Sequence, residues 1–471
     1  MDIKEKRKEL LYRHISRNLE ELIVNAVYKF GEKLPSIRTI CQQYKVSMST
    51  ALQAYYDLES KSMIEARPQS GYYISYCPKK IHALPETSKP ASGNIQEIDS
   101  IIEKVYSGIS NKNLTLFSLY VPSGELLPLA KLNKGIVHAT RTLPDSGTSY
   151  EPAQGNEKLR RQIAKRSFQW EGHLNENDII TTNGCSNAIS FCLMALTRRG
   201  DTIAVESPVY FGLLQLALNL GLKVVELPTH AKTGVELEAL NKALSKNKIK
   251  ACILVSNFNN PLGSCMPDEH KKEVVRLLEF HNIPLIEDDL YGDLYFGDNR
   301  PKSCKTYDQS GLVLWCGSAS KTIAPGYRVG WLAPGKFKHE IVKIKFFHSL
   351  SSTTITHEVI ADFLENGRYE NHLKKLRRQL EFNYKQYTRA IAEYFPADTK
   401  LSRPEGGLGL WVELNKKINT IDLYESAIRQ KISIAPGRMF TLQKQFDNCM
   451  RLSFGITWSS QLENKLKTLG K

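Results

Sequence analysis

The segment GSASKTIAPGYRVGW, residues 317–331, holds a lysine among groups suited to a phosphate. Lys321 can form a Schiff base with a carbonyl compound, provided that its amine is held at a fixed point. Ser318 and Ser320 offer hydroxyl groups close by, and Arg328 offers a planar fork that suits phosphate oxygens. A lone lysine is usually a solvated surface group, but the spacing S-x-S-K-x-x-A-P-G-x-R-x-G is specific. The segment predicts covalent binding of a phosphorylated aldehyde.

A second segment, IEDDLYGDLYF, follows an apolar run that ends where open α/β sheets place ligand-binding groups. An acidic loop at a strand end is the ordinary interpretation of a Glu-Asp-Asp run. Its position before Lys321 and the tyrosine three residues after Asp288 favour a site instead. Asp288 would pair with a protonated pyridine nitrogen and Tyr291 with a ring hydroxyl. Together with Lys321, these residues predict pyridoxal 5'-phosphate (PLP) as cofactor.

Two shorter motifs add weaker candidates. NFNNPLG places Asn260 before a proline, as a second partner for the ring hydroxyl. TNGCSNAIS places Gly184, Cys185 and Ser186 at a predicted strand-to-helix turn, where free backbone N–H groups and the helix dipole favour a phosphate.

Two single residues complete the predicted site. The ring of Tyr210, in ESPVYFG, could stack on a pyridine, although core packing is the commoner role of such a residue. Arg451, in MRLSFG, could hold a substrate or effector carboxylate in a bidentate pair, the alternative being an ordinary surface arginine.

The elements that would position these residues follow an alternating pattern. The apolar runs DTIAVES, KACILVSN, IPLIEDD and GLVLWCGS are separated by longer helical stretches. This rhythm predicts parallel β-α-β units and a doubly wound, mainly parallel sheet. From about Asn371, a basic helix and the strands around LGLWVEL and MRLSFG predict a smaller α+β subdomain.

The first 76 residues have a different pattern. A helix is predicted over residues 7–30, with Leu11, Ile15, Leu19, Leu22, Ile23 and Val27 on one face and Gly31 as its stop. A short helix then opens at Pro35 and Ser36, and a second helix is capped by Ser47. Residues 63–75 read as two short strands joined by a turn, so the segment predicts a winged helix-turn-helix.

The second helix of such a domain presents its first residues to the bases in the major groove, while basic side chains and a glycine at the wing approach phosphates and the minor groove. The residues predicted to contact DNA are Arg38, Ser47, Ser49, Thr50, Arg67, Gln69, Ser70 and Gly71.

Composition agrees with a polyanion as partner. The formal net charge is +15, and residues 1–80 contain 14 Lys+Arg against 9 Asp+Glu. The nine cysteines are odd in number and show no C-x-x-C pair, so neither a disulfide framework nor a metal site is predicted. The charged amino terminus does not resemble a signal peptide, and no apolar run is long enough for a membrane span. A cytoplasmic location is expected.

The quoted motifs resemble known families. KLPSIR followed by VSMSTALQAYYDLESKSMIEARPQSGYYIS resembles the GntR-type winged helix, although no basic residue stands beside Met48 and Ser49. Residues 114–471 resemble a fold type I aminotransferase, with NGCSNA in place of the glutamine-rich phosphate turn common there. The whole chain resembles the MocR/GabR group of bacterial regulators. Expected domains are therefore 1–76 (DNA-binding), 77–113 (linker) and 114–471 (PLP-binding, with the smaller subdomain mainly 371–471).

The resemblance implies a homodimeric transcriptional regulator that binds a double-stranded DNA operator. It also implies that Lys321 binds PLP and that the large domain senses a small amino compound or PLP itself. Two alternatives stay open: an active aminotransferase with an appended DNA-binding domain, and a PLP storage or scaffold protein.

Overall fold

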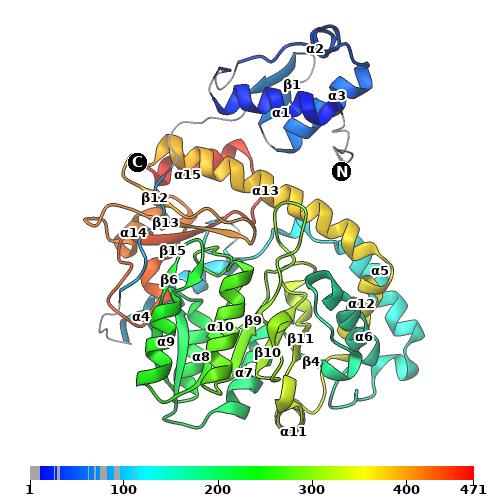
Figure 1. Ribbon diagram of the computed structural model, residues 1–471, viewed down its shortest axis with the longest axis vertical. Coiled ribbons are helices and arrows are strands. Elements are labelled where there is room, and N and C mark those ends of the chain that lie inside the picture. Colours follow the sequence, from blue (N-terminus) through cyan, green and yellow to red (C-terminus); the bar gives the residue numbers. More distant parts are fainter. Residues whose placement is uncertain are drawn as a thin grey trace, which may run out of the picture. The chain divides into compact units, whose positions relative to one another are not determined.

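The computed structural model describes residues 11–25, 27–28, 32–61, 63–67, 70–74, 82–89, 96–111 and 113–471 (Figure 1). The chain divides into two compact units. One unit contains residues up to 82 together with 381–397 and 458–471, and the other contains residues 83–380 and 398–457.

The first unit contains the winged helix-turn-helix. Helices α1 (Leu11–Val24), α2 (Ile37–Tyr44) and α3 (Met48–Ser60) precede the antiparallel strands β1 (Ile64–Arg67) and β2 (Gly71–Ile74). The side chains of Ser36 and Ser47 accept hydrogen bonds from the backbone N–H groups of Thr39 and Thr50, so the predicted cap at Ser47 is confirmed and Ser36 caps α2 in the same way. The Tyr55 hydroxyl donates to the Pro35 carbonyl at 2.6 Å and fixes α3 against the start of α2.

Only half of the residues predicted to form the apolar face of the first helix are buried. Ile15, Leu19 and Ile23 are buried in the core of the winged helix, whereas Leu11, Leu22 and Val27 are exposed. The predicted helix over residues 7–30 is too long at its carboxyl end: α1 ends at Val24, and the described residues 25, 27 and 28 are not helical, so Val27 lies beyond the packed face. Within α1, which packs mainly on α3, the buried stripe is narrower than predicted. The predicted stop at Gly31 lies outside the described residues.

The same unit includes the end of the long helix α13 (Arg368–Tyr394) and helix α15 (Ser460–Leu469). Arg389 forms an ion pair of 2.9 Å with Glu463, and the ring of Tyr387 lies 5.5 Å from that of Trp458. These contacts join the two helices to each other.

The second unit is built on an eight-stranded sheet with the order β4-β11-β10-β9-β8-β5-β6-β7. The strands β10, β9, β8, β5 and β6 are parallel, and β11 and β7 run antiparallel to their neighbours. The predicted doubly wound, mainly parallel sheet is confirmed. The strands are β4 (Ile180–Thr182), β5 (Thr202–Ser207), β6 (Lys223–His230), β7 (Gly234–Val235), β8 (Ile249–Leu254), β9 (Leu285–Asp288), β10 (Val313–Ser318) and β11 (Gly330–Ala333).

Helices cover both faces of this sheet. Alternate residues of β5 point to opposite faces: Ile203 packs in one core with α7 and α8, and Ala204 packs in another with α9 and α10. A third core, around Trp315, joins the sheet to α5, α6 and α12. The helices are α5 (Leu129–Thr142), α6 (Glu157–Ser167), α7 (Cys185–Leu196), α8 (Phe211–Asn219), α9 (Leu237–Lys246), α10 (Asp268–Phe280), α11 (Lys338–Ser349) and α12 (Thr354–Glu365).

A smaller antiparallel sheet, β12-β13-β16-β15, forms the predicted α+β part together with α14 (Thr420–Arg429). Its strands are β12 (Lys400–Leu401), β13 (Gly409–Glu413), β15 (Ala435–Pro436) and β16 (Cys449–Ser453). The short strand β3 (Thr115–Leu116) pairs with β14 (Ile432–Ser433), and helix α4 (Gln96–Ser107) precedes it in the chain. Within the described ranges, no helix has the length and apolar character that crossing a bilayer requires.

Ser47→Ala should destabilise α3 locally. Removing the cap hydroxyl costs about 1 kcal/mol, so amide hydrogen exchange in residues 48–60 should become about fivefold faster. Hydrogen-exchange mass spectrometry of the full chain measures this. Ser49→Ala, the same change within the first turn, is the control, and equal exchange in the two variants would contradict the role of the cap.

Candidate functional site

Lys321 lies in the turn that follows β10, and its side chain is partly buried. Its Nζ donates a hydrogen bond of 2.7 Å to the backbone carbonyl of Tyr120. Burial, helped by the positive charge of Arg451, lowers the pKa of Lys321 to about 8, although the carboxylate of Asp288 opposes the shift. A larger share of this amine than of an ordinary lysine is therefore neutral near pH 7.

Asp288 is the last residue of β9 and is 6% exposed. Its Oδ1 accepts hydrogen bonds from the Cys185 thiol at 3.3 Å and from the Leu290 backbone N–H at 3.2 Å. Burial raises the pKa of Asp288 to about 6, and the positive charge of Lys321 acts in the opposite direction. Asp288 and Lys321 therefore lie within each other's electrostatic field.

The other carboxylates of this acidic run are engaged elsewhere. Glu287 accepts hydrogen bonds from serine hydroxyls and backbone N–H groups. Asp289 and Asp293 both pair with the buried guanidinium of Arg300, at 2.6 and 2.7 Å. Asp288 has no ion-pair partner among the described residues, unlike Asp289 and Asp293, and its Oδ1 accepts only from the Cys185 thiol and one backbone N–H.

Tyr291, Asn260 and Arg451 form a hydrogen-bonded chain. The Asn260 amide donates to the Tyr291 hydroxyl at 3.4 Å, and Arg451 Nη1 donates to Asn260 Oδ1 at 2.8 Å. The other end of the guanidinium donates to the backbone carbonyl of Ser118. Burial raises the pKa of Tyr291 well above its usual value.

Arg451 is a buried cation without a carboxylate partner. It is 1% exposed, its guanidinium lies 4.6 Å from the ring centroid of Tyr120 and 5.1 Å from that of Phe440, and Nε has no hydrogen-bond partner. No described carboxylate lies within ion-pair distance of it. Because an uncompensated buried charge costs several kcal/mol, the guanidinium is suited to an anionic group of a ligand.

Around Gly184 the backbone comes close to Arg328. Gly184 has a φ of 95°, and a Cβ there would lie 2.4 Å from Arg328 Nη2. Helix α7 begins at the next residue, Cys185, without a side-chain cap, which leaves its first N–H groups free of partners in the helix. Ser186 is exposed in that first turn. The Arg328 guanidinium reaches Ser320 Oγ at 3.4 Å and makes its other hydrogen bonds to carbonyl oxygens.

Ser318 is the last residue of β10, and Tyr210 lies between β5 and α8. The buried Ser318 hydroxyl donates to the Val329 carbonyl at 2.7 Å and lies 2.8 Å from Ser320 Oγ, so it supports the turn that carries Ser320. Tyr210 precedes α8, and its ring packs 4.6 Å from that of Phe211. Burial raises the pKa of Tyr210, with a smaller contribution from Asp288.

The sequence analysis missed Tyr120, Ser118 and Phe440. Tyr120 contributes a backbone carbonyl to Lys321 and a ring to Arg451, and that ring stands edge-on to Tyr291 at 5.3 Å. Ser118 contributes only its carbonyl. Every residue has a backbone carbonyl, so the sequence SLYVPSG did not indicate that its carbonyl groups belong to the site.

In the winged helix, Ser47, Ser49 and Thr50 share the first turn of α3. The Ser47 hydroxyl lies 2.9 Å from that of Ser49 and 2.8 Å from that of Thr50. Arg38 is exposed on α2, and Gly71 begins the second wing strand with a φ of 105°.

At the tip of the wing, the Ser70 hydroxyl lies 2.6 Å from that of Tyr73. The side chain of Arg67 and the whole of Gln69 lie outside the described residues. Lys33, which pairs with Tyr73 through an isolated β-bridge, is a further cation at the wing that the sequence analysis did not single out.

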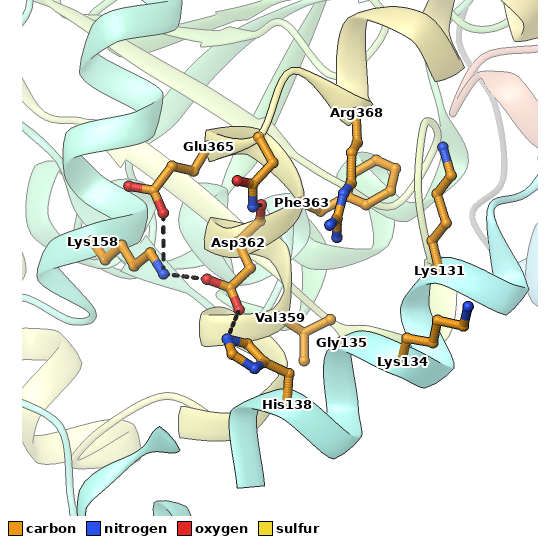
Figure 2. A pocket seen from close by; sticks show the side chains of 11 residues that line it. Lys131, Lys134, Gly135, His138, Lys158, Val359, Asp362, Phe363, Glu365 and Arg368 are labelled. Carbon is orange, nitrogen blue, oxygen red and sulfur yellow. Dashed lines mark hydrogen bonds and ion pairs between the residues drawn. The ribbon is translucent and has the colours of Figure 1, made fainter. Parts of the chain in front are cut away.

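A cavity of about 620 Å³ lies elsewhere in the second unit, between α5, α12 and the first residue of α13 (Figure 2). Figure 2 shows Lys158 between the carboxylates of Asp362 and Glu365, and His138 reaching Asp362 from α5. These charges compensate one another, and none of the predicted site residues lines this cavity.

Comparison with known proteins assigns both parts of the chain. Residues 11–74 match the gntR family of bacterial regulatory proteins, and residues 122–468 match aminotransferase class I and II. The HTH-type transcriptional regulator YjiR of Escherichia coli K12 is 36% identical over 465 residues, which cover 98% of both chains.

Two solved structures share the fold of the large part. The multiple substrate aminotransferase from Thermococcus profundus is 24% identical and has a TM-score of 0.73 over 79% of this chain and 94% of its own. LysN, the α-aminoadipate aminotransferase of Thermus thermophilus, was solved with N-(5'-phosphopyridoxyl)-L-leucine. It is 23% identical and has a TM-score of 0.72 over 78% of this chain and 95% of its own.

The family matches and the full-length relative agree on the order of the two parts. The chain therefore belongs to the HTH-type transcriptional regulators in which a gntR-family DNA-binding domain precedes an aminotransferase class I and II domain.

Proposed function

We propose that this regulator binds an operator through its winged helix, holds PLP on Lys321 and senses a small amino compound in its aminotransferase-like domain. The observation that carries the proposal is the buried site in which the amine of Lys321 lies in the fields of a carboxylate, Asp288, and an unpaired guanidinium, Arg451. Both parts occur in one chain, which favours sensing coupled to DNA binding.

The residues present fit PLP. Gly184 has no side chain, so its backbone leaves a space beside Arg328 that a Cβ would fill. The donors suited to the phosphate of PLP are Arg328, Ser320 and the first N–H groups of α7. Asp288 is an uncompensated carboxylate suited to a pyridinium nitrogen. The hydroxyl of Tyr291 and the amide of Asn260 are paired with each other and suit a ring hydroxyl. When bound, PLP supplies an aldehyde that takes up amines and a ring that withdraws electrons from them.

Each residue has a separate role around this group. Lys321 binds it covalently, and its lowered pKa supplies the neutral amine that this bond needs. Asp288 is held by Cys185 and Leu290 and keeps a proton on the ring nitrogen. Tyr210, just before α8, would be the aromatic side chain that stacks on the ring.

Arg451 selects the effector by charge. Its guanidinium is held by neutral oxygens alone, so an incoming carboxylate gains a charge-assisted pair without displacing a competing anion. The effector class is therefore an amine that carries a carboxylate.

DNA binding responds if the effector has different affinities for two arrangements of the regulator, a difference of about 1–3 kcal/mol in typical cases. A homodimer supplies two winged helices for an operator of matching symmetry. Whether transcription rises or falls depends on which arrangement the effector favours.

The same residues also support transamination as a second candidate function. The partly neutral amine of Lys321 is suited to act as a proton-transfer base, and Arg451 would then clamp a substrate. Repeated conversion of an amino acid with a 2-oxo acid distinguishes turnover from a single half-reaction, which is all that a sensor needs.

Apo-protein mixed with PLP should develop a visible absorbance band, and the rate should rise with pH up to about 8. The reason is that the amine reacts when neutral, and about a tenth of it is neutral at pH 7, against fewer than about one in a thousand for an ordinary lysine. Stopped-flow absorbance from pH 6 to 9 measures this. Lys321→Ala should leave the absorbance of free PLP unchanged, and Lys336→Ala, at an exposed lysine, should behave as wild type. A band of unchanged intensity in Lys321→Ala would refute the site.

Arg451→Lys should weaken alanine binding by about 10- to 100-fold, since a hydrogen bond to a charged group is worth about 1.5–3 kcal/mol. Ethylamine, which lacks the carboxylate, should bind to wild type and variant alike. Titration of the absorbance band gives both affinities. An equal loss for the two ligands would show that Arg451 does not select the carboxylate.

Arg38→Ala should weaken binding to operator and to unrelated DNA alike and lower the slope of log K against log salt by about 1. Arg38→Lys keeps the charge and should keep the slope. Fluorescence anisotropy at several salt concentrations provides the measurement. A slope unchanged in Arg38→Ala would remove Arg38 from the phosphate contacts.

A further inference from the structure

Helix α4 is held by both halves of the second unit. It lies in the segment that we assign as the linker, which follows the DNA-binding domain in the chain. The Gln215 amide of α8 donates to Asp99 at 2.8 Å. At the other end, Lys104 forms an ion pair of 2.8 Å with Glu425 of α14, and its carbonyl accepts from the Tyr424 hydroxyl at 3.1 Å. A shift of the small sheet and α14 relative to the large sheet must therefore strain α4.

Residues 82–89, which precede α4 in the chain, also contact both halves of the second unit. The Ser88 hydroxyl donates to the carbonyl of Ser207, at the end of β5, at 2.8 Å. Glu86 pairs with Lys400 of the small sheet at 2.5 Å, and its N–H donates to Glu413 at 2.8 Å. The linker segment thus touches both halves at two separate places.

The last turn of α4 carries Tyr106 to the edge of the candidate site. Its ring lies 5.2 Å from Phe211, that of Phe211 lies 6.2 Å from Phe440, and Phe440 lies beneath the guanidinium of Arg451. The Tyr106 and Tyr210 phenols are close enough for each to act on the pKa of the other. Tyr106 is nevertheless 37% exposed, so part of its surface is available to a ligand.

Electrostatics supports this placement. Burial raises the pKa of Tyr106, and the positive charge of Arg451 opposes the shift. A carboxylate bound at Arg451 would cancel the charge that now acts on Tyr106. The phenol is therefore close enough to respond to the occupant of the Arg451 position.

We propose that Tyr106 is a specificity-determining residue that contacts the side chain of the bound amino acid, so that the effector acts directly on the linker helix α4. This inference rests on the proposed function and names the effector more closely. The exposed part of Tyr106 offers aromatic surface and no charge, with the buried rings of Phe211 and Phe440 packed behind it, so it suits an apolar or aromatic side chain better than a second charged group.

Phenylalanine and alanine, which differ by one phenyl ring, test the inference. Tyr106→Ala should weaken phenylalanine binding at least about tenfold and change alanine binding less than about twofold, because only the larger side chain loses apolar contact. Absorbance titration of the PLP-loaded protein gives both affinities. The effect of phenylalanine on operator affinity should fall in parallel. Glu103→Ala, at an exposed position of the same helix, is the control and should match wild type.

The outcomes separate this inference from the proposed function. If wild type gives no absorbance band with PLP, the proposed function fails. If wild type responds to both amino acids and Tyr106→Ala responds as Glu103→Ala does, the inference fails while the proposed function stands.

A second measurement tests the inference even if Tyr106→Ala disrupts the folded site. Phenylalanine should slow hydrogen exchange in residues 99–107 of wild type more than alanine does, and Tyr106→Phe should retain the selectivity of wild type. Equal exchange with the two amino acids would overturn the inference.

Discussion

Burial of Lys321 within the fields of two further buried charges, Asp288 and Arg451, is the constraint on which the site depends. Asp288 alone would tend to take up a proton, and Lys321 alone would tend to lose one, because burial disfavours the charged form of each. Their mutual attraction moderates both shifts, and Arg451 adds a repulsion that keeps the amine partly neutral. The ligand that we propose, with a positively charged ring and a carboxylate, would compensate the charges of Asp288 and Arg451.

The other charged groups near the site have partners of their own in the fold, so they do not compensate these charges. Arg300 neutralises Asp289 and Asp293, and backbone donors surround Glu287, so Asp288 faces the site without a competing cation from that direction. The surroundings of Arg451 differ from those of Asp289 and Asp293. It has hydrogen bonds to neutral oxygens and aromatic faces around it, which hold its orientation without cancelling its charge.

Position in the fold links this chemistry to regulation. Asp288 and Lys321 belong to the large sheet, whereas Arg451 lies on β16 of the small one. A ligand that contacts all three joins the two halves. Helix α4 and residues 82–89 also contact both halves, so in the regulation that we propose they would respond to such a ligand.

Local sequence was sufficient for the features that depend on neighbours in the chain. The caps at Ser36 and Ser47, the glycine turn at Gly184 and the placement of Asp288 at a strand end follow from backbone chemistry over a few residues. Periodicity was less reliable at α1, where the exposure of Leu22 depends on how closely α3 packs. The motif spacing also grouped Lys321 with Arg328, which lie in one turn.

Only the tertiary structure decided that Asp289 and Asp293 pair with Arg300 while Asp288 lies in the field of Lys321. The tertiary structure also placed Tyr120 and Tyr106 at the site. Tyr120 contributes a backbone carbonyl and Tyr106 contributes the position of its ring, and residue type encodes neither. Hydrogen bonds close in sequence are specified by local geometry. Charge compensation and aromatic contacts between distant segments arise only when the chain folds and excludes water from between them.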